Sequence, residues 1–108
     1  MPTTSLRPGR DLHALHQRIN DLNSAILTLV KQRSEAVIAI AQVKEELGIT
    51  AFDQRREEEM LRRVVRAAQG PYDEGELREI FTALFRASLA LQQRARRPRA
   101  QRQRRRQV

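Results

Sequence analysis

The stretch LHALHQRINDLNSAILTLVKQRSEAVIAIAQVKEEL, residues 12–47, decides the fold of this chain. Its apolar residues recur in steps of three or four, which places them on one face of an α-helix. This face comprises eleven positions: Leu12, Leu15, Ile19, Leu22, Ile26, Leu29, Arg33, Val37, Ile40, Lys44 and Leu47. Nine of them are aliphatic, and the other two are the cations Arg33 and Lys44. Because an unpaired charge is costly to bury, these cations predict a buried anion, either a protein carboxylate or a ligand.

Arg33 and Lys44 point in the same direction, because an interval of eleven residues makes almost three helical turns. They are expected roughly 16 Å apart along the helix axis, so that their long side chains can hold one small anion between them. Each cation alone has a simpler interpretation. Arg33 would set the register of a coiled coil or form a salt bridge between helices. Lys44 would extend to solvent from the helix end.

The first helix is expected to begin at Arg10 or Asp11 and to end near Leu47, where Gly48 is a typical C-terminal stop. Such a helix is roughly 50 Å long or more. No single helix in the rest of the chain could cover it. We therefore expect its apolar face to be covered by an antiparallel second copy or by the folded-back remainder of the chain.

Two further helices complete an all-α, three-helix protomer. Asp53 is the expected N-cap of the second helix, which ends near Ala68, before the Gly70-Pro71 break. Asp73, followed three residues later by Glu76, is typical of a capping box and opens the third helix.

The apolar face of the third helix becomes polar near its end, at Ser88 and Gln92, one turn apart. These two residues are either a satisfied polar pair near the helix end or part of a site. The charged run DQRREEE at residues 53–59 is most simply a capped and solvated first turn. We favour a site because all of these polar groups interrupt or adjoin an apolar helix face.

Composition excludes several classes of protein. A chain of 108 residues forms one small domain, and the absence of cysteine excludes disulfides and thiolate metal sites. His13 and His16 lack acidic or thiol neighbours in metal-site spacing, so we expect neither a metal nor a cofactor. Residues 1–9 are expected to form a flexible leader without a signal sequence, and no apolar run approaches 18 residues. We expect a cytoplasmic protein with no membrane contact.

The net charge of +8 arises in residues 94–108, RARRPRAQRQRRRQV, which contain eight arginines and no acid. Without these eight, 13 Lys and Arg balance 13 Asp and Glu, so residues 1–93 are neutral. Residues 94–108 are typical of an Arg-rich disordered tail. One interpretation is that the tail is a nonspecific anchor, which binds either nucleic acid or an acidic surface of another protein. The other is that it is an extension without function.

Residues 10–93 resemble the all-helical (AroQ-type) chorismate mutases. Four stretches make the resemblance: LHQRINDLN at 15–23, ILTLVKQRSEAVIAIAQVK at 26–44, FDQRREEEML at 52–61 and GPYDEGELREIFTALFRASLALQQ at 70–93. From residue 52 onward the sequence is especially similar to the mutase domains associated with 3-deoxy-arabino-heptulosonate-7-phosphate (DAHP) synthase. The resemblance implies an intertwined antiparallel homodimer with two equivalent sites. It also implies the Claisen rearrangement of chorismate to prephenate, in phenylalanine and tyrosine biosynthesis.

The same resemblance implies roles for three residues around the reacting bond. Arg33 would hold a substrate carboxylate, for which its planar guanidinium is suited. Lys44 would bridge a carboxylate and the ether oxygen whose bond breaks. Gln92 would hydrogen-bond that oxygen from the other side and stabilise charge that develops in the transition state. The sequence has no evident nucleophile–base pair, which agrees with catalysis by positioning and electrostatics.

Four more residues have implied roles in holding the substrate ring. Glu57 would bind the ring hydroxyl, and Asp53 would assist through its backbone or side chain. Arg56 and Ser88 would support the ring carboxylate.

His16 departs from the family pattern. The family usually has an arginine seventeen residues before the position of Arg33, and that arginine crosses to the partner's site. We expect His16 to replace it as a weaker, pH-dependent carboxylate donor, since only a protonated imidazole is charged. The alternative is that this contact is lost and that activity is poor.

Three other functions compete with the mutase. Isochorismate-pyruvate lyase uses a similar cationic pocket on a related substrate. The second is a regulatory module that binds chorismate or prephenate for a DAHP synthase partner. The presence of His16 in place of the usual arginine favours this function. A helical nucleic-acid-binding protein is disfavoured, because the domain is neutral and only the tail is basic.

Overall fold

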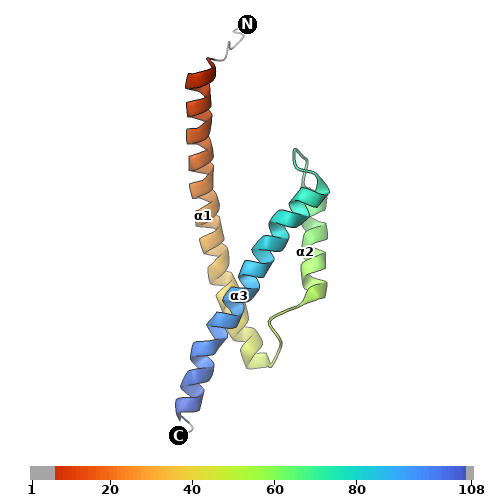
Figure 1. The fold of residues 1–108 in the computed structure, drawn as a ribbon. Helices are drawn as coiled ribbons and strands as arrows, with labels where there is room; N and C mark the ends of the chain where they lie inside the picture. Colours follow the sequence, from red (N-terminus) through yellow and green to blue (C-terminus); the bar gives the residue numbers. More distant parts are fainter. Residues whose placement is uncertain (1–6, 107–108) are drawn as a thin grey trace. The chain divides into compact units, whose positions relative to one another are not determined.

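The computed structural model describes residues 7–106, and it describes side chains for residues 7–96. Within this part the chain forms three α-helices and no strand, as expected (Figure 1). Helix α1 comprises Pro8–Leu47, α2 comprises Gln54–Ala67 and α3 comprises Glu74–Arg106. The chain divides into two compact units, Met1–Arg33 and Ser34–Val108, with the boundary inside α1.

Helix α1 begins at Pro8, two residues before the expected start at Arg10. Proline is favoured at the first helical position, because its fixed φ suits the helix and the missing N–H has no intrahelical partner there. The backbone N–H of Arg7 donates to the Asp11 carboxylate, which also belongs to the first turn. This local bond helps to fix the start of the helix.

The first unit exposes a row of aliphatic side chains, which we call the N-terminal apolar stripe. Its six members are between 44% and 63% exposed: Leu12, Leu15, Ile19, Leu22, Ile26 and Leu29. Scattered exposed apolar residues are normal on a protein surface, but a continuous row at helical spacing is typical of an interaction surface.

Helix α1 ends in a Schellman motif, as its glycine predicted. Gly48 has a φ of 68°, in the left-handed region that favours glycine. The N–H of Gly48 donates to the carbonyl of Glu45 at 3.2 Å, and the N–H of Ile49 donates to the carbonyl of Lys44 at 2.8 Å. Two of the carbonyls that have no partner within the helix are thereby satisfied.

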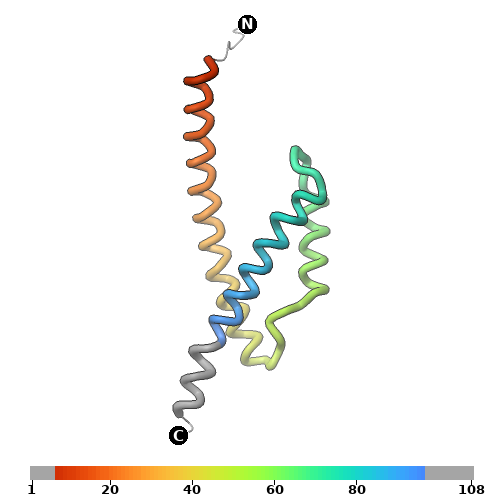
Figure 2. The backbone as a smooth tube through the Cα atoms, in the orientation of Figure 1, coloured from red at the N-terminus to blue at the C-terminus, as the bar shows by residue number. Residues whose placement is uncertain are grey.

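Helices α2 and α3 form a hairpin within the second unit (Figure 2). The expected caps are present at both helix starts. Asp53 caps α2, and Asp73 forms a reciprocal capping box with Glu76, whose two hydrogen bonds measure 3.0 Å and 2.8 Å. Helix α2 ends at Ala67, one residue before the expected end, with Ala68 as its C-cap.

Three helices contribute to the small core of the second unit. Among the described residues, those below 10% exposure are Val37 and Ala41 from α1, Leu61 from α2 and Phe85 from α3. Phe85 also contacts Phe81 edge to face, with ring centroids 6.2 Å apart. The core therefore joins the end of α1 to the α2–α3 hairpin.

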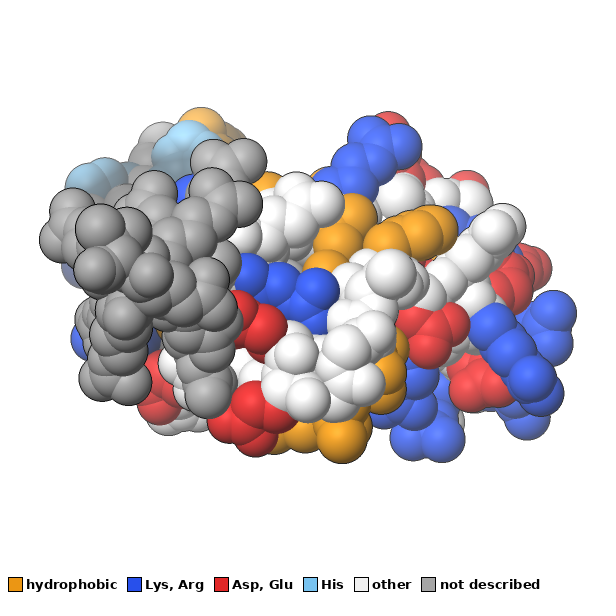
Figure 3. Space-filling model, turned by 90° about the horizontal axis from the view of Figure 1, so that it is seen from below, with side chains coloured by type: hydrophobic (Ala, Val, Ile, Leu, Met, Phe, Trp, Pro, Cys, Tyr) orange, Lys and Arg blue, Asp and Glu red, His pale blue; other side chains and the backbone are white. Residues whose placement is uncertain are grey.

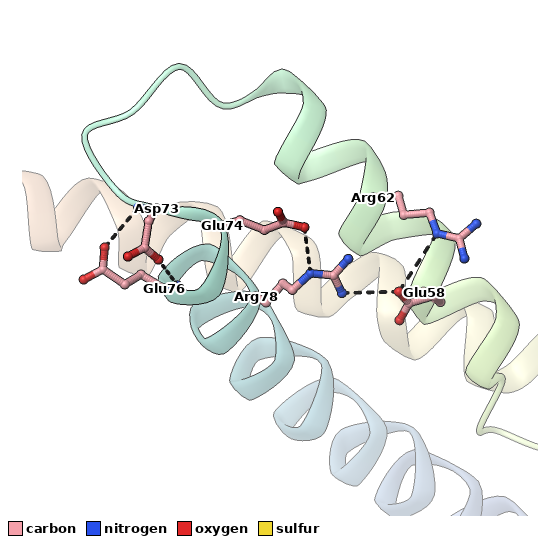
Figure 4. Close-up of polar contacts among 6 residues, drawn as sticks. All are labelled: Glu58, Arg62, Asp73, Glu74, Glu76 and Arg78. Atoms are coloured by element: carbon pink, nitrogen blue, oxygen red, sulfur yellow. Dashed lines mark hydrogen bonds and ion pairs between the residues drawn. The ribbon is translucent and has the colours of Figure 1, made fainter.

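An ionic network joins α2 to α3 on the surface of the hairpin (Figure 4). The guanidinium of Arg78 lies 3.2 Å from Glu58 of α2 and 3.3 Å from Glu74 of its own helix. The hydrogen bonds that Arg78 donates to Glu58, and secondly to Glu74, raise the pKa of Arg78 above its ordinary value. Arg62 adds a longer contact to Glu58, at 4.0 Å. Exposed pairs of this kind contribute little stability, so the network mainly fixes the alignment of the hairpin.

Helix α3 extends past the expected domain end at residue 93, to Arg106. Side chains from residue 97 onward lie outside the described part, as do residues 1–6 of the expected leader. The predicted leader and disordered tail therefore stay predictions. None of the helices in the described part is both long and apolar enough to cross a membrane.

Candidate active site

Lys44, from the predicted site, lies in the last turn of α1 and is half-buried. Its Nζ donates a hydrogen bond of 2.9 Å to the carbonyl oxygen of Ala51, in the connection between α1 and α2. An ammonium group has three N–H donors, so this bond uses one of them. The two others give Lys44 the capacity to bind an anion or an ether oxygen.

Ser88 and Gln92 lie one turn apart on α3, and both are half-buried. The hydroxyl of Ser88 donates to the carbonyl of Leu84 at 2.8 Å, a common local bond in helices. Gln92 differs, because its Oε1 is buried and has no hydrogen-bond partner among the described residues.

A buried amide without a partner costs free energy, about 1–3 kcal/mol for the unsatisfied group. Native proteins satisfy most buried polar groups, and the exceptions are often functional. A ligand donor would satisfy Gln92 directly. After a 180° flip of the amide, a ligand acceptor would satisfy its NH2 group instead, since the two orientations fit the same outline. Gln92 is thus one of two described residues, with Glu45, that have a buried side-chain oxygen without a partner.

Arg96 brings the relevant turns of α1 and α3 together. Its Nε donates to the carbonyl of Ala41 at 3.4 Å, and its Nη2 donates to the carbonyl of Ile49. Arg96 is one turn beyond Gln92, and Ala41 is three residues before Lys44. The helical turns of Lys44 and Gln92 therefore lie in the same part of the second unit.

The start of α2 contributes Asp53, Arg56 and Glu57. The Oδ1 of Asp53 accepts a hydrogen bond of 3.1 Å from the backbone N–H of Arg56, so this carboxylate serves as the N-cap. The side chains of Asp53 and Arg56 are exposed, whereas Glu57 is half-buried. The simpler interpretation of the 53–59 run, a capped first turn, accounts for Asp53 in this structure.

Arg33 and His16 belong to the first unit, unlike the other predicted site residues. Arg33 is half-buried and has a polar or electrostatic partner. His16 is exposed, close to the N-terminal apolar stripe. The second unit therefore contains Lys44, Ser88 and Gln92, and also Asp53, Arg56 and Glu57 at the start of α2. Among these, the contacts of Arg96 bring together the turns of Lys44 and Gln92.

Sequence reasoning missed two residues here. Arg96 was assigned to the tail because it stands in a run of arginines, although its place four residues after Gln92 continues the polar face. Glu45 follows Lys44 directly, and its Oε2 is buried without a hydrogen-bond partner among the described residues. No pattern in the sequence distinguishes Glu45 from the exposed Glu46 beside it.

Charges of both signs are mixed on the face of the molecule that Figure 3 shows. Figure 3 shows basic and acidic side chains interspersed with apolar ones. Among the side chains of residues 7–96, no group of three or more His, Asp or Glu could hold a metal ion. The predicted site residues offer cations, carboxylates, an amide and a hydroxyl to a ligand.

Comparison with known families decides the identity of this arrangement. The family model for chorismate mutase type II matches residues 15–93. The chain belongs to this family. It is accordingly an enzyme, an isomerase, as the resemblance predicted. No curated protein matches the chain.

Solved structures agree with this assignment. Form II of the chorismate mutase from Thermus thermophilus is 34% identical, with a TM-score of 0.76, over 78% of this chain and 96% of that one. Form I of the same enzyme is 33% identical, with a TM-score of 0.70, over 72% and 98%. A conserved hypothetical protein from Pyrococcus furiosus is 35% identical, with a TM-score of 0.63, over 76% and 95%.

Proposed function

We propose that this chain converts chorismate to prephenate, in phenylalanine and tyrosine biosynthesis in the cytoplasm. The observation that carries this proposal is the buried Oε1 of Gln92, which has no hydrogen-bond partner among the described residues and lies on the α3 turn next to the end of α1 that contains Lys44. A hydrogen-bonding amide and an ammonium group with two remaining donors suit an ether oxygen that gains negative charge.

The reaction needs little from the protein beyond position and charge. In one pericyclic step the ether carbon–oxygen bond breaks while a new carbon–carbon bond forms in the same molecule. No proton, electron or outside atom is exchanged. Catalysis then comes from holding the substrate in its reactive conformation and from stabilising charge that exists only in the transition state.

We assign the two donors to opposite sides of the ether oxygen. Lys44 donates to this oxygen and to a substrate carboxylate, while its bond to the carbonyl of Ala51 fixes the ammonium group. Gln92 donates from α3 after its amide orients the NH2 group toward the substrate. Arg33 binds a carboxylate through two parallel hydrogen bonds.

The remaining assignments concern the substrate ring. Glu57 accepts a hydrogen bond from the ring hydroxyl, and Asp53 assists while it caps α2. Arg56 and Ser88 bind the ring carboxylate. Because the N-terminus of a helix attracts anions, the start of α2 is a suitable place for such a group.

A second copy of the chain completes the site in this proposal. The N-terminal apolar stripe is about half exposed along its whole length, and an antiparallel copy would cover it with an identical stripe. The neutral charge of residues 1–93 leaves no large repulsion between two such domains. In this arrangement His16 crosses to the partner's site and contacts a substrate carboxylate.

The decisive experiment is incubation of the purified full chain with chorismate. We expect chorismate to disappear and prephenate to form, without metal or cofactor. Release of pyruvate from isochorismate, with no prephenate from chorismate, would instead identify the lyase.

His16 supports one alternative of a different class, because the expected cation is missing there. In that alternative the chain binds chorismate or prephenate without converting it and regulates a DAHP synthase. Co-purification with the synthase and feedback inhibition that depends on this chain would support it. Rapid turnover of chorismate by the chain alone would exclude a purely regulatory role.

A further inference from the structure

We propose that Arg96 is a positioning residue that fixes the place of Lys44 by holding the end of α1 and the connection to α2. Its effect on catalysis depends on the proposed mutase function. The structural part of the proposal, the fixed connection, does not.

The two carbonyls that Arg96 binds lie on either side of Lys44. Ala41 is three residues before it and Ile49 is five residues after it. Ala41 is completely buried, so the guanidinium reaches a carbonyl in the core of the second unit. Arg96 thereby links the buried carbonyl of Ala41 in α1 to the carbonyl of Ile49 in the connection between α1 and α2.

Lys44 depends on the same connection for its own orientation. Its Nζ donates to Ala51, which is only two residues beyond Ile49. A displacement of Ile49 would therefore move the carbonyl that holds the ammonium group. The orientation of Lys44 thus depends on the position of Ala51, which depends on Ile49 and therefore on Arg96.

The connection has little apolar packing that could replace this contact. Ile49 and Phe52 are each about half exposed, at 48% and 51%. Local bonds within the connection include the one from the Thr50 hydroxyl to the carbonyl of Phe52, at 3.3 Å. Arg96, in contrast, anchors the connection from a different helix.

Arginine suits this role better than lysine. Its planar guanidinium presents donors in several fixed directions, so Nε and Nη2 can bind two separate carbonyls at once. An ammonium group at the same position is shorter in reach and would hold one carbonyl at most in this geometry. The proposal therefore predicts only partial rescue by Arg96→Lys.

The test compares Arg96→Ala and Arg96→Lys with Arg94→Ala, an exposed arginine on the same helix that gives the same change of charge. A displacement of a catalytic group by about 1 Å can lower the reaction rate by about a hundredfold. We therefore expect Arg96→Ala to lower kcat roughly ten- to a hundredfold. KM should rise by less than kcat falls, because Lys44 also binds a substrate carboxylate in the ground state while its bond to the ether oxygen is strongest in the transition state. Arg96→Lys should retain an intermediate kcat, and Arg94→Ala should match the parent.

Two further measurements separate positioning from general destabilisation. In a double-mutant cycle with Lys44→Gln, adding Arg96→Ala should cause almost no further loss, because both changes act on one group. Hydrogen exchange of the Gly48 and Ile49 amides, both hydrogen-bonded in the parent, should become several-fold faster in Arg96→Ala. In an active parent, additive losses, an unchanged kcat or unchanged exchange would each overturn the proposal.

The outcomes also distinguish this proposal from the proposed function. If the parent chain does not convert chorismate, the mutase function fails, and amide exchange alone decides whether Arg96 fixes the connection. If the parent is active and Arg96→Ala keeps its kcat, the positioning role fails while the function stands. Should Arg96→Ala not fold, Arg96→Lys gives the same comparison in a folded protein.

Discussion

Lys44 donates a hydrogen bond of 2.9 Å to the carbonyl oxygen of Ala51, across the C-terminal end of α1. The sequence predicted a carboxylate or a ligand beside this cation, and the structure adds a main-chain carbonyl as a partner. A cation near the C-terminus of a helix is also favoured by the helix dipole. The cost of a lysine on an apolar face is thus partly offset within the chain, while two N–H donors stay available for an anion.

Replacing Lys44 by methionine should remove most of the activity. If its ammonium group stabilises charge at the ether oxygen, kcat should fall by roughly 10²- to 10³-fold, as for the loss of one transition-state donor. Steady-state kinetics with chorismate would measure this. Lys31→Met, at an exposed lysine of the same helix, is the matched control. Equal activity of the two variants would remove Lys44 from the mechanism.

Gln92→Leu should separate stability from activity. The buried Oε1 has no partner among the described residues, so an apolar side chain of similar size should raise the free energy of unfolding by about 1 kcal/mol. The same change should lower kcat/KM by at least tenfold, because a donor to the ether oxygen is lost.

Chemical denaturation and kinetics measure the two effects, with the exposed neighbour in Gln93→Leu as the control. A Gln92→Leu protein that is less stable but fully active would contradict both parts of this prediction.

The C-terminal end of α1 and the starts of α2 and α3 were well predicted from sequence because they depend on local chemistry, whereas α3 continues to Arg106, past the expected domain end at residue 93. Gly48, Asp53 and Asp73 each satisfy backbone groups within five residues of their own positions. The start of α1 was placed two residues late, since the preference of proline for a first helical position was not applied to Pro8.

The candidate site could be predicted only in part, for physical reasons that its residues illustrate. Lys44 and Gln92 were found because each is a polar group that interrupts an apolar face, a pattern visible in one helix. Arg96 was missed because its partners, Ala41 and Ile49, are distant in sequence and are backbone carbonyls, which leave no side-chain signature. Contacts of this kind become visible only in three dimensions.

Gly48→Ala should destabilise the protein without a direct effect on substrate contacts. At a φ of 68°, a Cβ atom is strained even though no neighbouring atom lies within 4 Å of its position. The expected loss in the free energy of unfolding is about 1 kcal/mol. Gly9→Ala, inside α1 and equally unobstructed, should be neutral or stabilising by up to about 1 kcal/mol. Thermal unfolding of both variants would test the contrast, and equal melting temperatures would contradict it.

His16→Arg should increase activity if this position contacts a substrate carboxylate. An arginine carries a permanent charge and can form two parallel hydrogen bonds to a carboxylate, whereas an imidazole cannot present such a pair of parallel donors. We expect kcat/KM to increase by roughly tenfold, the equivalent of about 1.4 kcal/mol. His13→Arg adds the same charge at another exposed position on α1. An unchanged kcat/KM for His16→Arg would show that the position does not contact substrate.

Ile19→Asp should dissociate the proposed dimer. Ile19 lies in the middle of the N-terminal apolar stripe and is 54% exposed in the single chain, so a carboxylate there is tolerated by the monomer. At the centre of a paired interface the same carboxylate would be buried without a partner, which is strongly unfavourable. Sedimentation should show a dimer for the parent and a monomer for Ile19→Asp, whereas Asn20→Asp, with the same charge one residue later, should stay dimeric. Because His16 would reach its site only across the dimer, the monomer should also lose activity, and a fully active monomeric Ile19→Asp would contradict the shared site.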